Sequence, residues 1–413
     1  MKDTLKPRLS FLFFLQFFIN GAIFPVIALY LKDSLQFTGG QAGLVMAMSS
    51  VTALVSPFLG AMVADKYIST ERLFALSHLV SGILLLFLRF QTRFVPVLVL
   101  YFFFALFFGP TPALGNAIVF HHAPEGREKF GGIRLWGTLG WVTVALGFGL
   151  FWLGRGKPLG DALGLAGLVG LLQALFVFIF LPRGEKRAAR RESLFPVQSL
   201  RLFLRKEIFL LSVVTLFFVT GEKIYYFGAG LYLRSLGLGE NLVLPFMSLA
   251  QAGEVLALIL VGLMLPRWGS KRIMLLGLAF SVVKFGFLFA GGPLWAAGIG
   301  VAAHGPAFAF FLVTTFIYLD RQCSAEDRSG VHQIFSFLEA GVANFIGNVG
   351  SGLIMDRLTG SSGLVNFRIY WFFPAGGAVI LFLMIFFFLP SRERPAITEY
   401  KAPPFPGDVT DQL

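Results

Sequence analysis

Apolar stretches of about 20 residues recur along the whole chain and are separated by short polar breaks. A stretch of this length crosses a bilayer as one α-helix, because the hydrocarbon core is about 30 Å thick and each helical residue adds about 1.5 Å. The pattern therefore predicts an all-α membrane protein with twelve transmembrane helices. The expected helices span residues 9–31, 41–64, 72–90, 95–119, 130–153, 163–182, 207–233, 242–265, 272–290, 294–318, 331–354 and 368–390.

The amino-acid composition also indicates a membrane protein. The 413 residues are 56% hydrophobic and 14% charged, whereas about a quarter of the residues of a soluble domain are charged. With both chain ends placed inside, 23 of the 34 Lys and Arg residues are cytoplasmic and 8 are outside. By the positive-inside rule, this asymmetry predicts a multi-pass protein of the cell (inner) membrane with cytoplasmic N- and C-termini. The net charge of +12 thus reflects topology, and no nucleic-acid partner is expected.

The chain divides near its middle into two similar halves. Gly109-Pro110 precedes Gly305-Pro306 by 196 residues, and Gly147 precedes Gly347 by 200. Such internal similarity is typical of transporters built from two repeats. The predicted domains are a six-helix bundle at 1–182, a basic cytoplasmic linker at 183–206, a second six-helix bundle at 207–390 and a cytoplasmic tail at 391–413.

Six charged residues lie inside the expected helices, three of each sign. They are Arg134, Glu222, Lys223, Glu254, Lys284 and Glu339. An unpartnered charge at the centre of a bilayer costs about 2.5 to 3.5 kcal/mol even on an insertion scale. We therefore expect these side chains to face one another or a water-filled cavity.

Polar and aromatic side chains share faces on three of these helices. The sets are Arg134, Thr138 and Trp141 at i, i+4 and i+7; Gln251 and Glu254 at i and i+3; and Glu222 and Tyr225 at i and i+3. Residues with these spacings project from the same side of a helix. Together they offer a guanidinium, carboxylates, an amide and aromatic rings, which predicts a cavity for a polar solute that contains a ring.

Two six-helix repeats joined by a basic loop resemble the major facilitator superfamily. In that superfamily a small solute binds between the halves near the middle of the membrane, and the halves rock about it. Segments 60–66 and 262–272 are similar to divergent copies of the superfamily's gating signature. The resemblance implies gating roles for Asp65, Lys66, Arg267 and Lys271. The alternative is that these charges only anchor the chain on the cytoplasmic side.

Several motifs resemble one family of that superfamily, the nucleoside:proton symporters. In the family's order they are 64–66 with His78, 133–138, the Gln251 and Glu254 pair, 267–269 with Lys284, and 307–311. The resemblance implies proton-coupled import of nucleosides by alternating access. It also implies a substrate site formed by Arg134, Thr138, Trp141, Glu222, Tyr225, Gln251, Glu254 and Phe308.

The chain departs from that family within the implied site. Trp141 stands where the family has Phe, and Glu222 and Tyr225 stand where it has Gln and Asn. Ala309 occupies a position beside Phe308 at which an acidic residue is expected. These differences leave open which nucleosides are preferred and which acid binds the proton.

Proton coupling requires a carboxylate whose charge depends on conformation, because burial favours its neutral form and a nearby cation favours its ionised form. Glu254 facing Arg134 fits this requirement best. Glu339 is an independent candidate that could replace the missing acid at position 309, and Glu222 is a further candidate.

Other polar residues of the helices are expected to have structural roles. Lys284 lies on a helix that is peripheral in this architecture, so we expect its side chain to extend to the membrane interface. His78 and His304 lack metal-ligand spacing, and packing roles are expected for both. Cys323 is the only cysteine, which excludes a disulfide within the chain. No cofactor or metal is predicted.

Three other functions fit the same sequence features. A proton symporter for sugars or oligosaccharides is the nearest alternative, because an Arg and Glu cage with a Trp serves sugars as well. A drug exporter and a sensor without transport activity are further alternatives. An enzyme is not expected, because the chain lacks His-x-x-x-His, Gly-x-Ser-x-Gly and Walker motifs. The expected partners are a small solute, a proton and the bilayer, and a monomer is expected.

Overall fold

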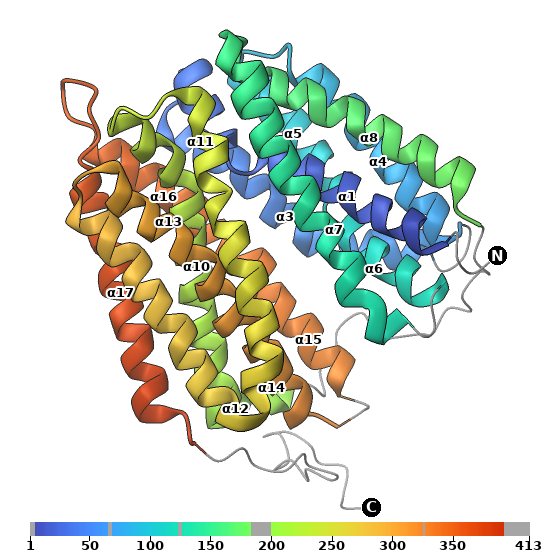
Figure 1. Ribbon diagram of the computed structural model, residues 1–413, viewed down its shortest axis with the longest axis vertical. Coiled ribbons are helices and arrows are strands. Elements are labelled where there is room, and N and C mark those ends of the chain that lie inside the picture. Colours follow the sequence, from blue (N-terminus) through green and yellow to red (C-terminus); the bar gives the residue numbers. More distant parts are fainter. Residues whose placement is uncertain (1–4, 65–67, 123–125, 183–199, 325–326, 392–413) are drawn as a thin grey trace, which may run out of the picture.

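The computed structural model describes residues 5–64, 68–122, 126–182, 200–324 and 327–391, and nearly all of these residues are helical. The helices form two bundles that lie beside one another (Figure 1). The first bundle contains α1 (Leu5–Ile23), α2 (Ile27–Leu29), η1 (Tyr30–Ser34), α3 (Gly39–Ala64), α4 (Thr70–Leu88), α5 (Phe94–Phe108), α6 (Thr111–His122), α7 (Gly126–Leu146), η2 (Gly147–Trp152), η3 (Leu153–Arg155) and α8 (Asp161–Phe180).

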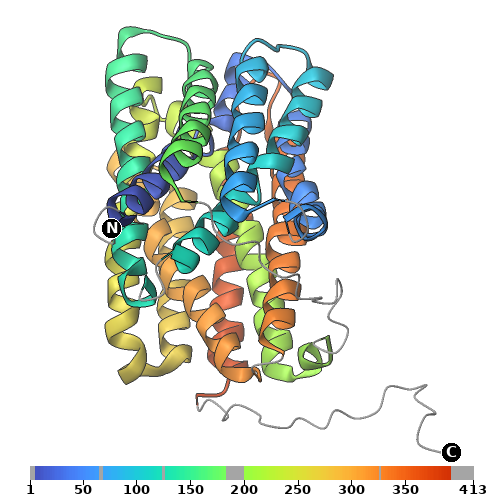
Figure 2. The ribbon, with the colours of Figure 1, turned by 90° about the vertical axis from the view of Figure 1, so that its right-hand side faces the viewer.

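The second bundle begins after the basic segment in the middle of the chain. It contains η4 (Arg201–Leu204), α10 (Lys206–Ser235), α11 (Glu240–Met247), α12 (Leu249–Ala290), α13 (Leu294–Phe308), η5 (Ala309–Val313), α14 (Thr314–Gln322), α15 (Arg328–Ser336), η6 (Phe337–Ala343), α16 (Asn344–Leu358) and α17 (Phe367–Phe388). In Figure 2 the first bundle lies in front of the second, which extends below it.

These elements follow the expected helices in order and position. Within the described ranges, nine helical segments are long and apolar enough to cross a membrane. One of them, residues 240–290, contains two of the expected helices. Gly269 (φ 74°) separates the two parts of α12, because its backbone is not helical and has a conformation that favours glycine. The observed helices are thus consistent with the expected twelve.

Among the residues that the structure describes, four π-helical segments interrupt the long helices: η1, η2, η5 and η6. A π-helical turn holds one more residue than an α-helical turn and often marks a functional site. The segment η5 follows Phe308 directly, and η6 contains Glu339. The hydrophobic pattern alone does not predict these interruptions.

Glycines allow neighbouring helices to approach closely within each bundle. A methyl group at Gly21 of α1 would come within 3.0 Å of Trp141 on α7, and one at Gly253 of α12 would come within 2.8 Å of Pro306 on α13. Small residues have this role in membrane proteins because association there relies on close packing rather than on the hydrophobic effect. These contacts fix the helices that carry the expected site residues.

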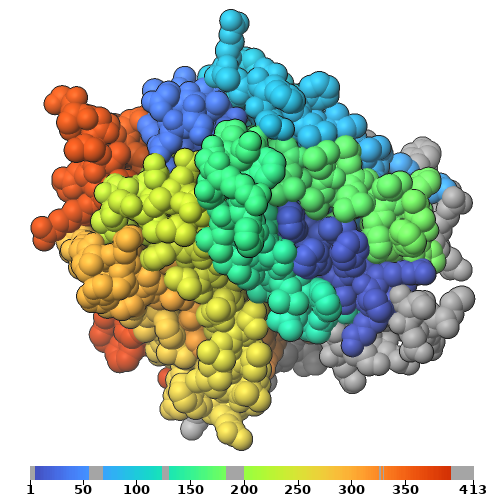
Figure 3. Space-filling model, turned by 45° about the horizontal axis from the view of Figure 1, so that its top comes forward, coloured from blue at the N-terminus to red at the C-terminus, as the bar shows by residue number. Residues whose placement is uncertain are grey.

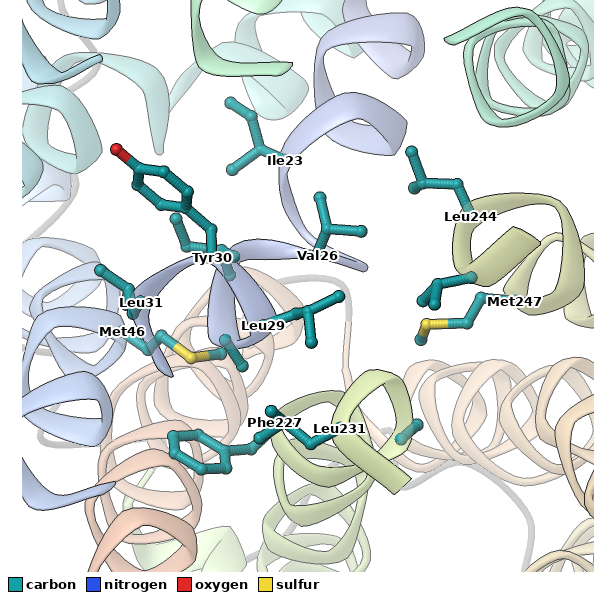
Figure 4. Close-up of a cluster of buried hydrophobic side chains, with 14 of the residues drawn as sticks. Ile23, Val26, Leu29, Tyr30, Leu31, Met46, Phe227, Leu231, Leu244 and Met247 are labelled. Atoms are coloured by element: carbon teal, nitrogen blue, oxygen red, sulfur yellow. The ribbon is translucent and has the colours of Figure 1, made fainter. Parts of the chain in front are cut away.

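The two bundles meet at one end of the molecule, around Gly39, Gly149 and Gly352, which we call the closed end. A methyl group at Gly149 of η2 would lie 2.6 Å from Pro245 of α11, and Gly39 packs directly on Gly352. In the space-filling view the surface of η2 lies against that of α11 at this end (Figure 3). Apolar side chains from both bundles, including Leu29 and Phe227, fill the space behind this contact (Figure 4).

A carboxylate of the second bundle caps a helix of the first at the closed end. The Asp356 side chain accepts hydrogen bonds from Gly39 N at 2.5 Å and Gly40 N at 2.7 Å, the first two amides of α3. Thr38 and Gln41 exchange a further pair of capping hydrogen bonds. Free amides at a helix N-terminus favour a negative charge, so Asp356 stabilises the contact between the bundles.

The described ends of the chain lie opposite the closed end. The helix α1 begins at Leu5 and reaches the closed end only after Ile23, and α17 ends beside Lys271, whose ammonium group donates to Phe386 O at 2.8 Å. The bundles diverge toward that side (Figure 1).

We expect Asp356→Ala to weaken the contact between the bundles at the closed end. A larger fraction of the molecules should then be in a conformation in which the bundles are separated there. Hydrogen bonds to a charged group contribute about 1.5 to 3 kcal/mol, and Asp356 is partly solvated, so an effect near the lower limit, about tenfold, is expected. The measurement is the rate at which a thiol reagent modifies a cysteine placed at Met46, a buried residue of α3, in a Cys323→Ala background.

Glu240→Gln is the matched control. Glu240 is also an acid in the first turn of a helix, but that helix, α11, belongs to the same bundle as Glu240 itself. A rate that is unchanged in Asp356→Ala, or raised equally in Glu240→Gln, would contradict the capping role.

Candidate functional site

A cavity of about 220 Å³ lies between the two bundles. Ligand pockets for drug-sized molecules are usually about 300 to 1,000 Å³, so this cavity suits a smaller solute. Both bundles contribute to its walls. The lining residues are Phe17, Arg134 and Trp141 from the first bundle and Val219, Glu222, Lys223, Tyr226, Gln251, Glu254, His304, Phe308, Leu312, Glu339 and Asn344 from the second.

Most of the residues that the sequence indicated meet at this cavity. Those that line it are Arg134, Trp141, Glu222, Gln251, Glu254, Phe308 and Glu339. Thr138 is not among the lining residues, although it shares the α7 face with Arg134. Tyr225 is buried behind the cavity, where its ring stacks on that of His304 at 4.5 Å, and the neighbouring Tyr226 lines the wall instead.

The Arg134 guanidinium is held from two sides. Its Cζ lies 3.8 Å from the centre of the Phe17 ring, which is a cation–π contact with the neighbouring helix α1. The Glu254 carboxylate of the other bundle balances its charge electrostatically. Arg134 and Glu254 thus interact electrostatically across the cavity from opposite bundles.

Gln251 and Glu254 are positioned by the contact between α12 and α13. Gly305 of α13 packs on the α12 backbone at Ala250 and Glu254, closer than any side chain would permit. The same contact brings His304, the residue before Gly305, to the cavity wall. One glycine therefore sets the place of an acid and a histidine.

A buried ion pair lies next to the cavity. The Lys284 ammonium group donates a short hydrogen bond to Glu222 Oε1, and the whole of Lys284 is buried. The expectation that Lys284 extends to the membrane interface is therefore wrong. The second part of α12 packs tightly against α13, with Gly300 close to Lys284 O, so the side chain turns inward to its counter-charge on α10.

His304 contacts the same carboxylate. Its Nδ1 lies 2.8 Å from Glu222 Oε2, an ion-pair distance without regular hydrogen-bond geometry. Its Nε2 lies 3.1 Å from the hydroxyl group of Tyr226. The expected packing role describes only part of this residue's surroundings, because His304 also faces the cavity.

Lys223 and Glu339 are a third pair of residues with opposite charges. The Lys223 charge interacts with those of Glu339 and, more weakly, Glu222. A methyl group at Gly347 of α16 would lie 2.6 Å from the Lys223 side chain, so α10 and α16 pack closely at this point. All six charges that the sequence placed inside the helices therefore have an opposite charge nearby.

Of the expected gating residues, Arg267 and Lys271 lie away from the cavity. Arg267 is exposed near the interruption of α12, and Lys271 is bound to the end of α17 in its own bundle. Asp65 and Lys66 lie outside the described residues. The gating roles of these four residues stay predictions.

His78 has the packing role that was expected. It is fully buried in the first bundle, and its Nε2 lies 2.7 Å from Gln16 Oε1, while Gln16 donates to Thr111 Oγ1 at 3.0 Å. In the part of the chain that the structure describes, no group of three His, Cys, Asp or Glu side chains is placed to hold a metal ion.

Comparison with known proteins identifies the family. Residues 1–394 match the family described as Nucleoside H+ symporter. The chain belongs to this family. It is 27% identical to the putative nucleoside transporter YegT of Escherichia coli (strain K12) over 95% of each chain. It is 24% identical to the xanthosine permease of the same organism over 97% of this chain and 99% of the permease.

Solved structures show that the fold is shared. Two structures of the nucleoside transporter NupG match with TM-scores of 0.85 and 0.83 at 22% identity, and the first match covers 94% of this chain and all of that one. This family member therefore has the fold of the major facilitator superfamily, as the sequence indicated, and it is a multi-pass membrane protein.

Proposed function

We propose that this symporter family member imports nucleosides together with protons by alternating access. The observation that carries the proposal is the cavity between the bundles, which combines charged pairs with aromatic rings from both sides. A site formed between two repeats can be opened to either side of the membrane by rocking one repeat against the other.

Trp141 and Phe308 are the proposed stacking residues. They line the cavity from opposite bundles, which supports contacts with a flat base. Stacking of a base on an aromatic ring contributes about 1 to 3 kcal/mol in single-stranded nucleic-acid binders, used here by analogy. A sugar can lie on one Trp, whereas two aromatic walls favour a nucleoside over the sugar alternative.

Gln251 and the charged residues are proposed to recognise polar groups of the nucleoside. The Gln251 amide offers two donors and two acceptors, which suit a base edge or a ribose hydroxyl. Arg134, Glu222 and Glu254 line the same cavity. Thr138 and Tyr225 stay predicted members of the site, with Tyr225 acting through His304 and Tyr226 rather than by direct contact.

The Arg134 and Glu254 pair is proposed to couple the proton to the solute. The two residues belong to opposite bundles, so their separation changes as the bundles rock. When Arg134 withdraws, the ionised form of Glu254 loses its counter-charge and proton binding is favoured. Glu339 and Glu222 stay alternative coupling acids.

The orientation follows from the charge asymmetry of the sequence. With both termini on the cytoplasmic side of the cell (inner) membrane, the closed end faces outward and the structure is inward-facing. We propose that the two domains comprise residues 1–182 and 207–390. We also propose that the protein acts as a monomer, because each chain forms its own cavity.

Uptake of radiolabelled uridine or adenosine into proteoliposomes tests the function. We expect uptake to increase when the outer solution is acidic and to collapse with a protonophore. Glu254→Gln should abolish accumulation but retain nucleoside exchange without a gradient, because the bound state is still formed. Glu240→Gln serves as a control at an acid remote from the cavity.

Sodium-driven uptake that a protonophore leaves unchanged would refute proton coupling. Full proton-driven accumulation by Glu254→Gln would show instead that another acid, such as Glu339, has the coupling role.

Substitution of the aromatic walls tests the substrate class. Trp141→Ala and Phe308→Ala should each weaken nucleoside affinity by about tenfold or more, whereas Trp141→Phe should have a mild effect. Trp136→Ala is the control, because Trp136 lies on the same helix but is exposed and absent from the cavity wall. Binding of a disaccharide at sub-millimolar concentration, with no binding of nucleosides, would replace this assignment by the sugar symporter.

A further inference from the structure

The two bundles carry buried polar groups at equivalent positions. Gln16 and Glu222 are 206 residues apart, and so are His78 and Lys284. Gln16 contacts His78 in the first bundle, and Glu222 contacts Lys284 in the second. The repeat therefore places the same contact twice, once between neutral groups and once between charges.

Gln16 and Glu222 each contact a further polar residue of their own bundle, and these residues differ in chemistry. Gln16 also binds a hydroxyl group, that of Thr111, at 3.0 Å. Glu222 also contacts an imidazole, that of His304, at 2.8 Å. The polar set of the second bundle therefore contains an additional ionisable group, the His304 imidazole, whereas the third member of the first set is a hydroxyl group.

The charges around the cavity balance without His304. Lys284 is paired with Glu222, Lys223 faces Glu339, and Arg134 faces Glu254. Because each cation already has an acid, the imidazole is neutral in a balanced cavity and imidazolium adds one charge. Histidine is the side chain whose ordinary pKa allows this change between about pH 5 and 8.

The surroundings of His304 also offer hydrogen-bond acceptors for its protonated form. Lys284 is bonded to Glu222 Oε1, which leaves Oε2 facing His304 Nδ1. An imidazolium can donate to this oxygen and to the Tyr226 hydroxyl on its other side. The ring lies at the cavity wall, so water in the cavity can deliver and remove the proton.

We infer that His304 is a proton-binding residue of the transport cycle. The inference rests on the proposed proton-coupled function. In the step itself a hydronium ion in the cavity loses a proton, which forms an N–H bond with the unprotonated nitrogen of the His304 ring; later this N–H bond breaks and the proton returns to water on the other side. The ionisable groups that face His304 or its partners are Glu222, Lys223, Tyr225 and Tyr226 of α10 and Lys284 and Glu254 of α12.

Tyr226 connects this proton to the solute site. Its hydroxyl group contacts His304, its ring lines the cavity, and it interacts electrostatically with Glu254. A change of charge at His304 therefore acts on the carboxylate that faces Arg134. Protonation of His304 can therefore alter the solute site through Tyr226.

The test compares His304→Gln with His78→Gln in proteoliposomes. Glutamine cannot bind a proton in this pH range but retains a polar contact. We expect His304→Gln to lose proton-driven accumulation by about tenfold or more and to lose the pH dependence of uptake between about pH 5 and 8, while nucleoside exchange without a gradient remains. His78→Gln alters the equivalent position of the first bundle and should retain coupling.

The outcomes separate this inference from the proposed function. Wild-type accumulation and wild-type pH dependence in His304→Gln would overturn the inference alone. A wild-type protein that neither exchanges nor binds nucleosides would refute the proposed function, and the inference with it.

A second measurement does not depend on the folding of a His304 variant. Wild-type protein labelled at its five histidines can be titrated by NMR, with each other histidine identified by its own substitution. We expect the remaining imidazole signal to titrate between about pH 5 and 8 and its midpoint to shift when nucleoside binds. A signal that stays in one protonation state throughout, with and without nucleoside, would overturn the inference.

Discussion

The ion pair between Glu222 and Lys284 is the constraint on which the second bundle depends. Both side chains are buried inside the membrane-spanning region, where an ion without a partner is penalised by several kcal/mol. Their contact fixes α10 against α12, and the close approach of α13 then brings His304 to the same carboxylate. The cavity wall on this side is built around one charged cluster.

The first bundle joins its helices by buried hydrogen bonds instead of an ion pair. Gln16, His78 and Thr111 form a neutral hydrogen-bonded set at the equivalent position. Phe17 and Trp141 present aromatic surface to the cavity from this bundle, and Arg134 is the charged residue that it contributes among the described lining residues. The two walls therefore differ mainly in their polar groups: the acids and the histidine lie on the second bundle, whereas both bundles contribute aromatic rings. The rings suit a flat base, and the polar groups of the second bundle suit the hydroxyl groups of a solute.

The sequence predicted the helices well, because the thickness of a bilayer sets the length of each apolar stretch. It also predicted most of the cavity, since residues such as Arg134 and Trp141 share a face by helical spacing alone. Lys284 was placed wrongly, because its partner Glu222 lies on a helix that is 62 residues away in the chain. The hydrophobic pattern cannot show which helices become neighbours.

Other features depended on the way the bundles close. The cap that Asp356 forms on α3 needs two segments that are more than 300 residues apart, and no local motif indicates it. Tyr226 rather than Tyr225 lines the cavity because one residue turns a helix by about 100 degrees. The neighbouring π-helical segments η5 and η6 add further rotation that a regular helix would not have.

A double-mutant cycle on Glu222 and Lys284 measures how strongly this ion pair stabilises the second bundle. The free energy of unfolding is compared for the wild type, Glu222→Gln, Lys284→Met and the double variant. Breaking a buried pair from one side usually costs about 3 to 5 kcal/mol, because a charge is left without a partner, whereas removing both charges costs far less. We expect each single variant to be strongly destabilised and the double variant to recover most of the lost stability. Single variants with stability close to the wild type, or a double variant whose loss equals the sum of the two, would contradict this expectation.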